Sequence, residues 1–161
     1  MKRTLLLLII TAITVISFSS SPVPVSYSPV FMSRQALESS VKYVPGARNM
    51  IQTGKIYYKY PYIYVNERYK GVHVINNTNP ALPVNEGFIL APGCIDMAVK
   101  ENILYLDNSV DLVSFDLINK QVTKRIRNVL PEPLPPEDFS FYGVKRPDGY
   151  VLVEWKKRTS N

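Results

Sequence analysis

Cysteine and histidine are nearly absent from this chain of 161 residues, which has one of each, Cys94 and His73. A single cysteine cannot form a disulfide within the chain, so the fold must be held by packing, or the thiol must pair with another chain. One histidine and one distant cysteine also fall short of the four ligands of a structural zinc site. Because Cys94 precedes an apolar segment, we expect a buried, inert thiol. We expect His73, between two valines, to be a packed or hydrogen-bonded strand residue.

Glycine is also scarce, with seven residues, and neither a phosphate-binding glycine loop nor a Gly-x-Ser-x-Gly elbow occurs. Four aspartates, Asp96, Asp107, Asp111 and Asp116, gather in one part of the chain, but their spacing does not match a calcium loop. We expect them to lie at strand ends and to accept hydrogen bonds from turn amides. The sequence therefore predicts no catalytic, cofactor-binding or metal-binding residue, and no cofactor.

Long apolar runs are limited to residues 5–18, which follow Lys2 and Arg3 and precede the small residues 19–21. This order is the pattern of an export signal, and the run is shorter than the roughly 20 residues that span a membrane. We predict a signal peptide over residues 1–21 and an exported protein, either periplasmic, on the outer surface or secreted. The alternative is an inner-membrane anchor formed by an uncleaved signal.

Acidic residues are outnumbered by basic ones, which gives a net charge of +6, and much of the excess lies in residues 124–127 and 156–158. Strand alternation would place Lys124 and Ile126 on one face and Arg125 and Arg127 on the other. We interpret this segment as a solvated edge strand that discourages strand addition. A nucleic-acid site would need a basic face with stacking aromatics, so no nucleic-acid partner is predicted.

Residues 22–53 form a Pro- and Ser-rich segment between the export signal and the fold. Prolines 22, 24 and 29 predict an extended, flexible tether. Residues 34–41 predict a short helix or turn within this linker.

Residues 54–161 consist of short runs rich in Tyr, Ile and Val, bounded by turn residues, which predict β-strands. Two sets of four strands follow each other: Tyr105 comes 41 residues after Tyr64, and Asp116 comes 40 residues after Asn76. This spacing is close to the roughly 40–45 residues of a four-stranded propeller blade. The predicted strands are residues 56–59, 63–66, 72–76 and 84–89, then 95–100, 104–107, 112–116 and 122–126, then 139–145 and 151–154.

The sequence thus predicts an all-β fold of four-stranded antiparallel, β-propeller-like blades. Blade 1 covers residues 54–90, blade 2 covers 91–130 and a partial blade 3 covers 137–155. Because about two and a half blades cannot close a ring, the chain is a truncated reading frame, an open array or one part of an assembly. We favour truncation from a longer propeller.

Two segments carry a resemblance to a known family. Residues 112–116 read LVSFD, and residues 72–76 read VHVIN and are followed by the turn NTNP. On these segments the chain resembles the LVIVD-repeat family, bacterial exported or surface proteins of the β-propeller type, over roughly two-fifths of its length. The resemblance implies a β-propeller fold and supplies no catalytic residue.

Tyrosine is abundant, with eleven residues, and six of them lie between positions 57 and 69. Exposed tyrosines make good contacts to protein or carbohydrate, whereas cross-strand packing is the alternative explanation. The candidate partner-contact residues are Tyr57, Tyr58, Tyr60, Tyr62 and Tyr69.

We expect a non-enzymatic exported β-repeat protein that offers a binding or scaffolding surface at the cell envelope. The alternatives are a truncated propeller enzyme, whose axial active site lay in the missing blades, and a non-functional remnant. The expected partners are a protein or carbohydrate at the envelope, or a second copy that associates through open sheet edges.

Overall fold

A computed structural model describes residues 27–136 and 145–158 of the chain. The predicted signal peptide, residues 1–21, and positions 137–144 of the predicted third blade lie outside these residues. Within the described ranges no helix combines the length and apolar character needed to cross a membrane. The elements are β1 (Tyr27–Ser33), α2 (Arg34–Glu38), β2 (Lys42–Pro45), β3 (Thr53–Lys59), β4 (Tyr62–Glu67), β5 (Gly71–Asn76), β6 (Val84–Leu90), β7 (Met97–Lys100), β8 (Ile103–Asn108), β9 (Asp111–Asp116), β10 (Gln121–Ile126) and β11 (Tyr150–Lys157).

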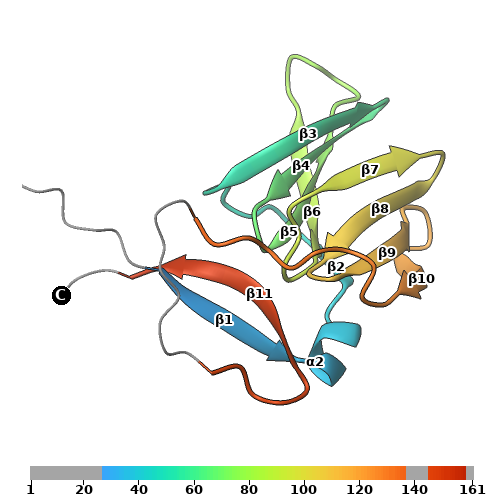
Figure 1. Ribbon diagram of the computed structural model, residues 1–161. Coiled ribbons are helices and arrows are strands. Elements are labelled where there is room, and N and C mark those ends of the chain that lie inside the picture. Colours follow the sequence, from blue (N-terminus) through green and yellow to red (C-terminus); the bar gives the residue numbers. More distant parts are fainter. Residues whose placement is uncertain (1–26, 137–144, 159–161) are drawn as a thin grey trace, which may run out of the picture.

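The fold is all-β, as predicted, and every strand pairing is antiparallel. One sheet has five strands in the order β2-β6-β5-β4-β3, and a second has four in the order β10-β9-β8-β7. Strands β1 and β11 form a separate two-stranded sheet (Figure 1). The eight strands predicted between residues 56 and 126 are therefore present, as β3 to β10.

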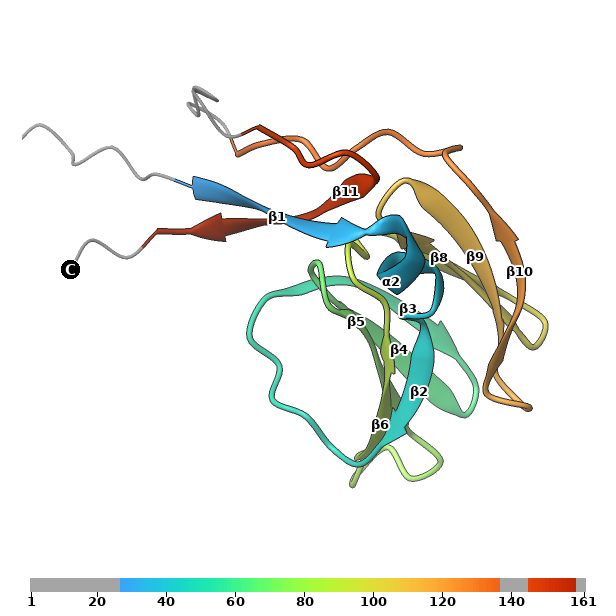
Figure 2. The ribbon, with the colours of Figure 1, turned by 90° about the horizontal axis from the view of Figure 1, so that it is seen from below.

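The five-stranded and four-stranded sheets pack face to face, as Figure 2 shows from below. Alternation decides which residues enter the interface, because successive side chains of a strand point to opposite faces. Val72 and Val74 of β5 enter it together with Leu104 and Leu106 of β8, while His73 points to the other face. At one edge β3 lies beside β7, where the Tyr57 hydroxyl donates to the Val99 carbonyl at 2.9 Å.

The predicted tether is wrong for residues 27–45, which form β1, α2 and β2. Strand β1 pairs with β11, and Pro29 is tolerated there because a two-stranded sheet leaves one side of each strand unpaired. The short helix predicted within this segment is present as α2, which Ser33 caps by accepting from the Ala36 amide at 3.3 Å.

The interpretation of residues 124–127 as a solvated edge is wrong for Arg125. Strand β10 is an edge strand, but the Arg125 guanidinium turns inward and pairs with Asp111 at 2.8 Å. Arg34 of α2 pairs with the other oxygen of the same carboxylate at 2.7 Å, although it lies 77 residues away. We call Arg34, Asp111 and Arg125 the aspartate clamp. It joins α2, β9 and β10.

A candidate binding cleft between the two sheets

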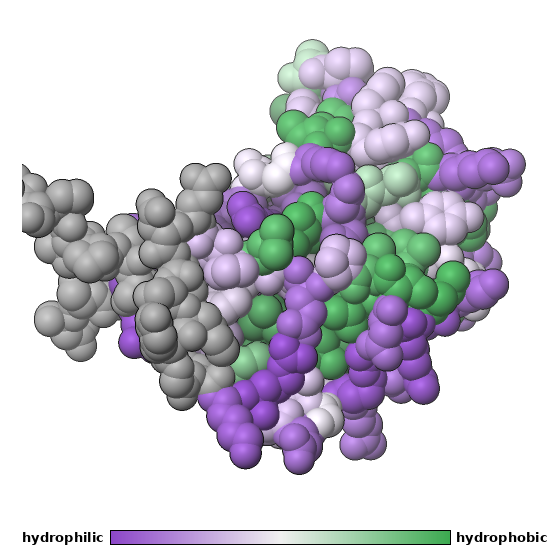
Figure 3. All heavy atoms as spheres, in the orientation of Figure 1, coloured by the Kyte–Doolittle hydropathy of each residue, from purple (hydrophilic) through white to green (hydrophobic). Residues whose placement is uncertain are grey.

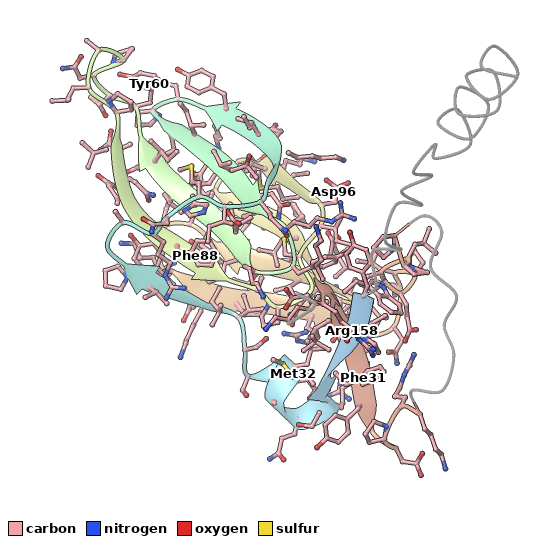
Figure 4. The ribbon with its side chains drawn as sticks, turned by 90° about the vertical axis from the view of Figure 1, so that its left-hand side faces the viewer. Phe31, Met32, Tyr60, Phe88, Asp96 and Arg158 are labelled. Atoms are coloured by element: carbon pink, nitrogen blue, oxygen red, sulfur yellow. The ribbon has the colours of Figure 1, made fainter. Side chains whose placement is uncertain are left out.

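A cleft of about 380 Å³ opens between the two large sheets, where the β3–β4, β7–β8 and β9–β10 turns meet. Its size is within the range of small-ligand sites. Four tyrosines line it, one from β2 and three from the β3–β4 hairpin: Tyr43, Tyr60, Tyr62 and Tyr64. We call it the tyrosine cleft. Figure 4 shows Tyr60 at the end of the two-sheet body that is remote from β1 and β11.

Tyr43 reaches the cleft by crossing Gly87 of the neighbouring strand. A Cβ atom on Gly87 would lie 2.2 Å from the Tyr43 hydroxyl oxygen, so only glycine leaves room for the ring in this position. The Tyr43 hydroxyl is 3.2 Å from the Glu86 carbonyl oxygen, to which it donates. Lys120 Nζ, from the β9–β10 turn of the other sheet, lies over the Tyr43 ring at 4.1 Å from its centroid, which is cation–π geometry. The ring is therefore held between the two sheets.

Tyr62 and Tyr64 alternate along β4 and point to the same side, with ring centroids 6.2 Å apart. Tyr64 is buried in the core beneath the cleft, whereas Tyr62 is half-buried. Burial, assisted by the neighbouring Tyr62, raises the pKa of Tyr64 to about 12. The Tyr64 phenol therefore stays protonated at neutral pH and can donate a hydrogen bond.

The cleft is also lined by charged side chains, with as many positive as negative ones: two lysines and two glutamates. Glu86 accepts from the Asn76 side-chain amide at 2.8 Å, and Lys120 stacks on Tyr43. Lys59 and Glu101 have no ion-pair partner within residues 27–136 and 145–158. The cleft therefore combines aromatic faces with polar groups while its formal charge is balanced.

The five tyrosines selected from the sequence do not form one surface. Tyr60, 71% exposed, and Tyr62 line the cleft, whereas Tyr58, 58% exposed, is not part of it. Tyr57 is partly exposed, and its hydroxyl bonds β7. Tyr69 is only 6% exposed and packs with Leu152 and Trp155, so it is not available to a partner.

The sequence did not indicate the residues that line the cleft from outside the tyrosine-rich hairpin. Tyr43 lies in the segment interpreted as a tether, and Glu101 and Lys120 lie in turns of the second sheet. No signal in the local sequence indicates that these turns face the hairpin. The nearest clue is Gly87 within a strand, because such a glycine often marks close approach by another group.

A larger hollow of about 590 Å³ lies where residues 130–134 cross β7 and β8. Figure 3 shows apolar surface gathered in this part of the molecule. Asp96 and Asp107 line it, but their carboxylates already bond protein groups. Lys55 donates to Asp96 at 2.6 Å, and the Asp96 amide donates to Asp107 at 2.9 Å. We therefore place the candidate site in the tyrosine cleft.

The prediction that strand-end aspartates accept hydrogen bonds from turn amides is confirmed for Asp116, whereas Asp111 forms the aspartate clamp. Asp116 accepts from the Ile118 and Asn119 amides at 2.8 and 3.0 Å, and these hydrogen bonds lower its pKa. For Asp107 burial dominates over bonds from the Asp96 and Ile95 amides, which raises its pKa. Among the described residues, no three His, Cys, Asp or Glu side chains are placed to share a metal ion.

Cys94 is buried, as expected, and His73, predicted to be a packed or hydrogen-bonded strand residue, is buried as well. The His73 ring packs edge-on against Phe88 with centroids 4.8 Å apart. Cys94 accepts from the Asn66 side-chain amide at 3.3 Å and its Sγ lies 3.6 Å from the Asp96 carbonyl oxygen.

We expect Cys94 to be unreactive in the folded protein. Burial, with smaller contributions from Asp107 and Asp96, raises the pKa of the thiol well above its ordinary value despite the Asn66 bond, so thiolate is scarce. Labelling with a disulfide reagent at pH 8 should proceed at the rate of unfolding and reach one thiol per chain in denaturant. Rapid labelling under native conditions would contradict the burial.

A comparison of the chain with protein-family models, curated proteins and solved structures finds no match. The candidate function must therefore be argued from the geometry of the cleft.

Proposed function

We propose that this is an exported, non-enzymatic β-repeat protein that binds carbohydrate at the cell envelope through the tyrosine cleft. The observation that carries the proposal is the meeting of four tyrosines with a balanced set of charges in one cleft of about 380 Å³. Tyrosine offers an apolar ring face and a hydroxyl group in one side chain. A sugar ring offers the same pair, an apolar C–H face and hydroxyl groups along its edge.

The balance of charge favours a neutral ligand. Two lysines and two glutamates can bond sugar hydroxyl groups as donors and acceptors, and none of them requires a counter-charge from the ligand. A charged peptide segment would leave one sign of the lining without a partner. A protein partner is therefore the alternative that the experiment below distinguishes.

We also propose that the two large sheets are blades of the β-propeller type, in keeping with the resemblance to LVIVD-repeat proteins. In support, the two sheets share a meander of four strands, β3 to β6 and β7 to β10. The non-glycine residues with positive φ at the second hairpin of each meander, Tyr69 and Ser109, are 40 residues apart. The first strands of the two meanders, β3 and β7, lie side by side, as the inner strands of neighbouring blades do.

We expect Tyr60→Ala to weaken glycan binding at least tenfold, which is about 1.4 kcal/mol. Tyr60 is 71% exposed at the mouth of the cleft, so its removal should leave the unfolding free energy nearly unchanged. Binding partners would first be sought on a microarray of neutral oligosaccharides. The affinity of the strongest would then be measured by titration calorimetry with wild type and variant.

Tyr58→Ala is the matched control, because Tyr58 is an exposed tyrosine of the same hairpin outside the cleft. It should bind the glycan like wild type. Equal losses in the two variants would contradict the assignment to the cleft. Binding to an immobilised peptide library, with none to the glycans, would favour the protein partner instead.

A further inference from the structure

Another cavity, of about 310 Å³, lies on the face of the five-stranded sheet opposite the four-stranded sheet. Residues 48–52, which connect β2 to β3, form one wall, and β4, β5 and β6 contribute Glu67, His73 and Phe88. We call it the histidine cavity. Figure 4 shows Phe88 in the body of the sheet, away from Tyr60, so this cavity is separate from the tyrosine cleft.

Glu67 fixes one side of the His73 ring. Its carboxylate accepts from the Ile51 amide at 3.1 Å and from the Gln52 amide at 2.5 Å, and His73 Nε2 lies 3.3 Å from it. Burial opposes ionisation, but these bonds outweigh it and lower the pKa of Glu67. An ionised Glu67 can only accept, so the bond requires that Nε2 carries a proton.

The other ring nitrogen, Nδ1, has no hydrogen-bond partner in the part of the chain that the structure describes, although the residue is fully buried. An unsatisfied buried polar atom is costly and is therefore a reason to expect a bound group. With Nε2 protonated, Nδ1 accepts a hydrogen bond when the ring is neutral and donates one when it is charged.

Two exposed guanidinium groups border the cavity and have no carboxylate partner among the described residues. Arg48 lies over the Phe88 ring, 4.9 Å from its centroid, and Arg68 lies over the Tyr69 ring at 5.1 Å. Lys70 pairs with Glu154 at 2.5 Å, so these two charges cancel, and the carboxylate of Glu67 offsets only one of the two arginines. The unmatched charge around the cavity is therefore positive.

We infer that the histidine cavity binds an oxyanion, the phosphate or carboxylate group of a small ligand. The planar guanidinium groups of Arg48 and Arg68 suit two oxygens of such a group. His73 Nδ1 provides the third contact. Inorganic phosphate as HPO₄²⁻, or a phosphate monoester that keeps one proton, carries both a hydroxyl donor and acceptor oxygens, so it satisfies Nδ1 in either protonation state of the ring. A carboxylate only accepts, so it requires the charged ring and takes up a proton on binding.

His73 is the only histidine of the chain, so its ring nitrogens give a single set of NMR signals when the protein is produced without a histidine tag. The experiment adds inorganic phosphate, and in a second arm acetate, to ¹⁵N-histidine-labelled protein at constant ionic strength set with sodium chloride. We expect a saturable shift of Nδ1, with Nε2 changing less. A shift on adding phosphate, with the protonation of the His73 ring unchanged, identifies a phosphate site. A shift on adding acetate, with proton uptake by the ring, identifies a carboxylate site.

Arg48→Ala and Arg68→Ala, made together, should reduce the affinity at least tenfold while the circular dichroism spectrum is unchanged, because both side chains are exposed. Arg127→Ala, which removes an exposed arginine that directly follows β10 and does not line this cavity, is the control and should bind like wild type. No saturable shift with either anion would overturn the proposal. Shifts that persist unchanged in the double variant would do the same.

Discussion

Asp111→Ala should lower the free energy of unfolding by about 3–5 kcal/mol, the range for removing one partner from a buried ion pair. Asp111 is 0% exposed, and its two oxygens pair with Arg34, whose side chain is 27% exposed, and with the more buried Arg125. The variant leaves the Arg125 guanidinium buried without its counter-charge. It also removes the acceptor of the Asn128 amide, 3.1 Å away. Urea unfolding followed by circular dichroism measures the loss.

Asp148→Ala is the control, because Asp148 is exposed in the turn before β11. Its unfolding free energy should stay within about 0.5 kcal/mol of wild type. If Asp111→Ala were equally mild, the aspartate clamp would not hold α2 against the second sheet.

The aspartate clamp also makes the free energy of unfolding depend on pH in the acid range. Burial opposes the ionisation of Asp111, but the bonds from Arg34, the Asn128 amide and Arg125 outweigh it and place its pKa below the ordinary value of 3.8. The unfolded chain therefore binds this proton more readily, and the stabilisation is present above pH 3.8 and lost as the pH falls toward the folded pKa. Urea unfolding at pH 7 and pH 3 should show a smaller loss on acidification for Asp111→Asn than for wild type.

Gly71→Ala should cost about 2–5 kcal/mol of unfolding free energy, from left-handed strain of about 1–2 and overpacking of about 1–3. Gly71 opens β5 with φ +143°, and a Cβ there would lie 2.0 Å from the Ile89 carbonyl oxygen and 2.9 Å from the Ala91 amide nitrogen. Ile89 belongs to the paired strand β6, and Ala91 directly follows that strand, so these backbone atoms cannot move aside without disturbing the β5–β6 ladder.

Gly46→Ala separates the two contributions, because Gly46 also has positive φ, +94°, but no atom within 4 Å of its Cβ position. We expect it to cost only the strain, about 1–2 kcal/mol. Thermal and urea unfolding of both variants measure the difference. If the two variants lost the same unfolding free energy, the backbone of β6 would not lie in contact with Gly71.

The strands were predictable because their signal is local. Short runs of Tyr, Ile and Val predicted the strands, and the turn residues between the runs predicted the hairpins. Alternation placed Val72 and Val74 on one face and His73 on the other, but it did not show which face meets the second sheet. The position of β1 was not predictable, because Pro29 and the neighbouring serines carry no strand signal. Its partner β11 lies more than a hundred residues away, and only that pairing makes the segment a strand.

Some residues of the candidate site could likewise be predicted from the local sequence, and others could not. An accumulation of tyrosines indicated the β3–β4 hairpin, and Tyr60 and Tyr62 lie in the cleft. Local sequence could not separate Tyr69 from them, because its burial depends on contacts with Leu152 and Trp155 of β11. Nor could it show that Arg125 pairs with Asp111. The alternation of residues 124–127 is the same whether Arg125 faces solvent or turns inward to a carboxylate.

The most direct test of the account is to map a bound glycan on the protein by amide chemical shifts, using the neutral oligosaccharide that binds most tightly. The cleft is built from both sheets, so we predict that perturbed amides cluster at residues 59–62, 101–102 and 117–120 together. Perturbations confined to β1 and β11, or to one sheet alone, would contradict a binding cleft between the sheets.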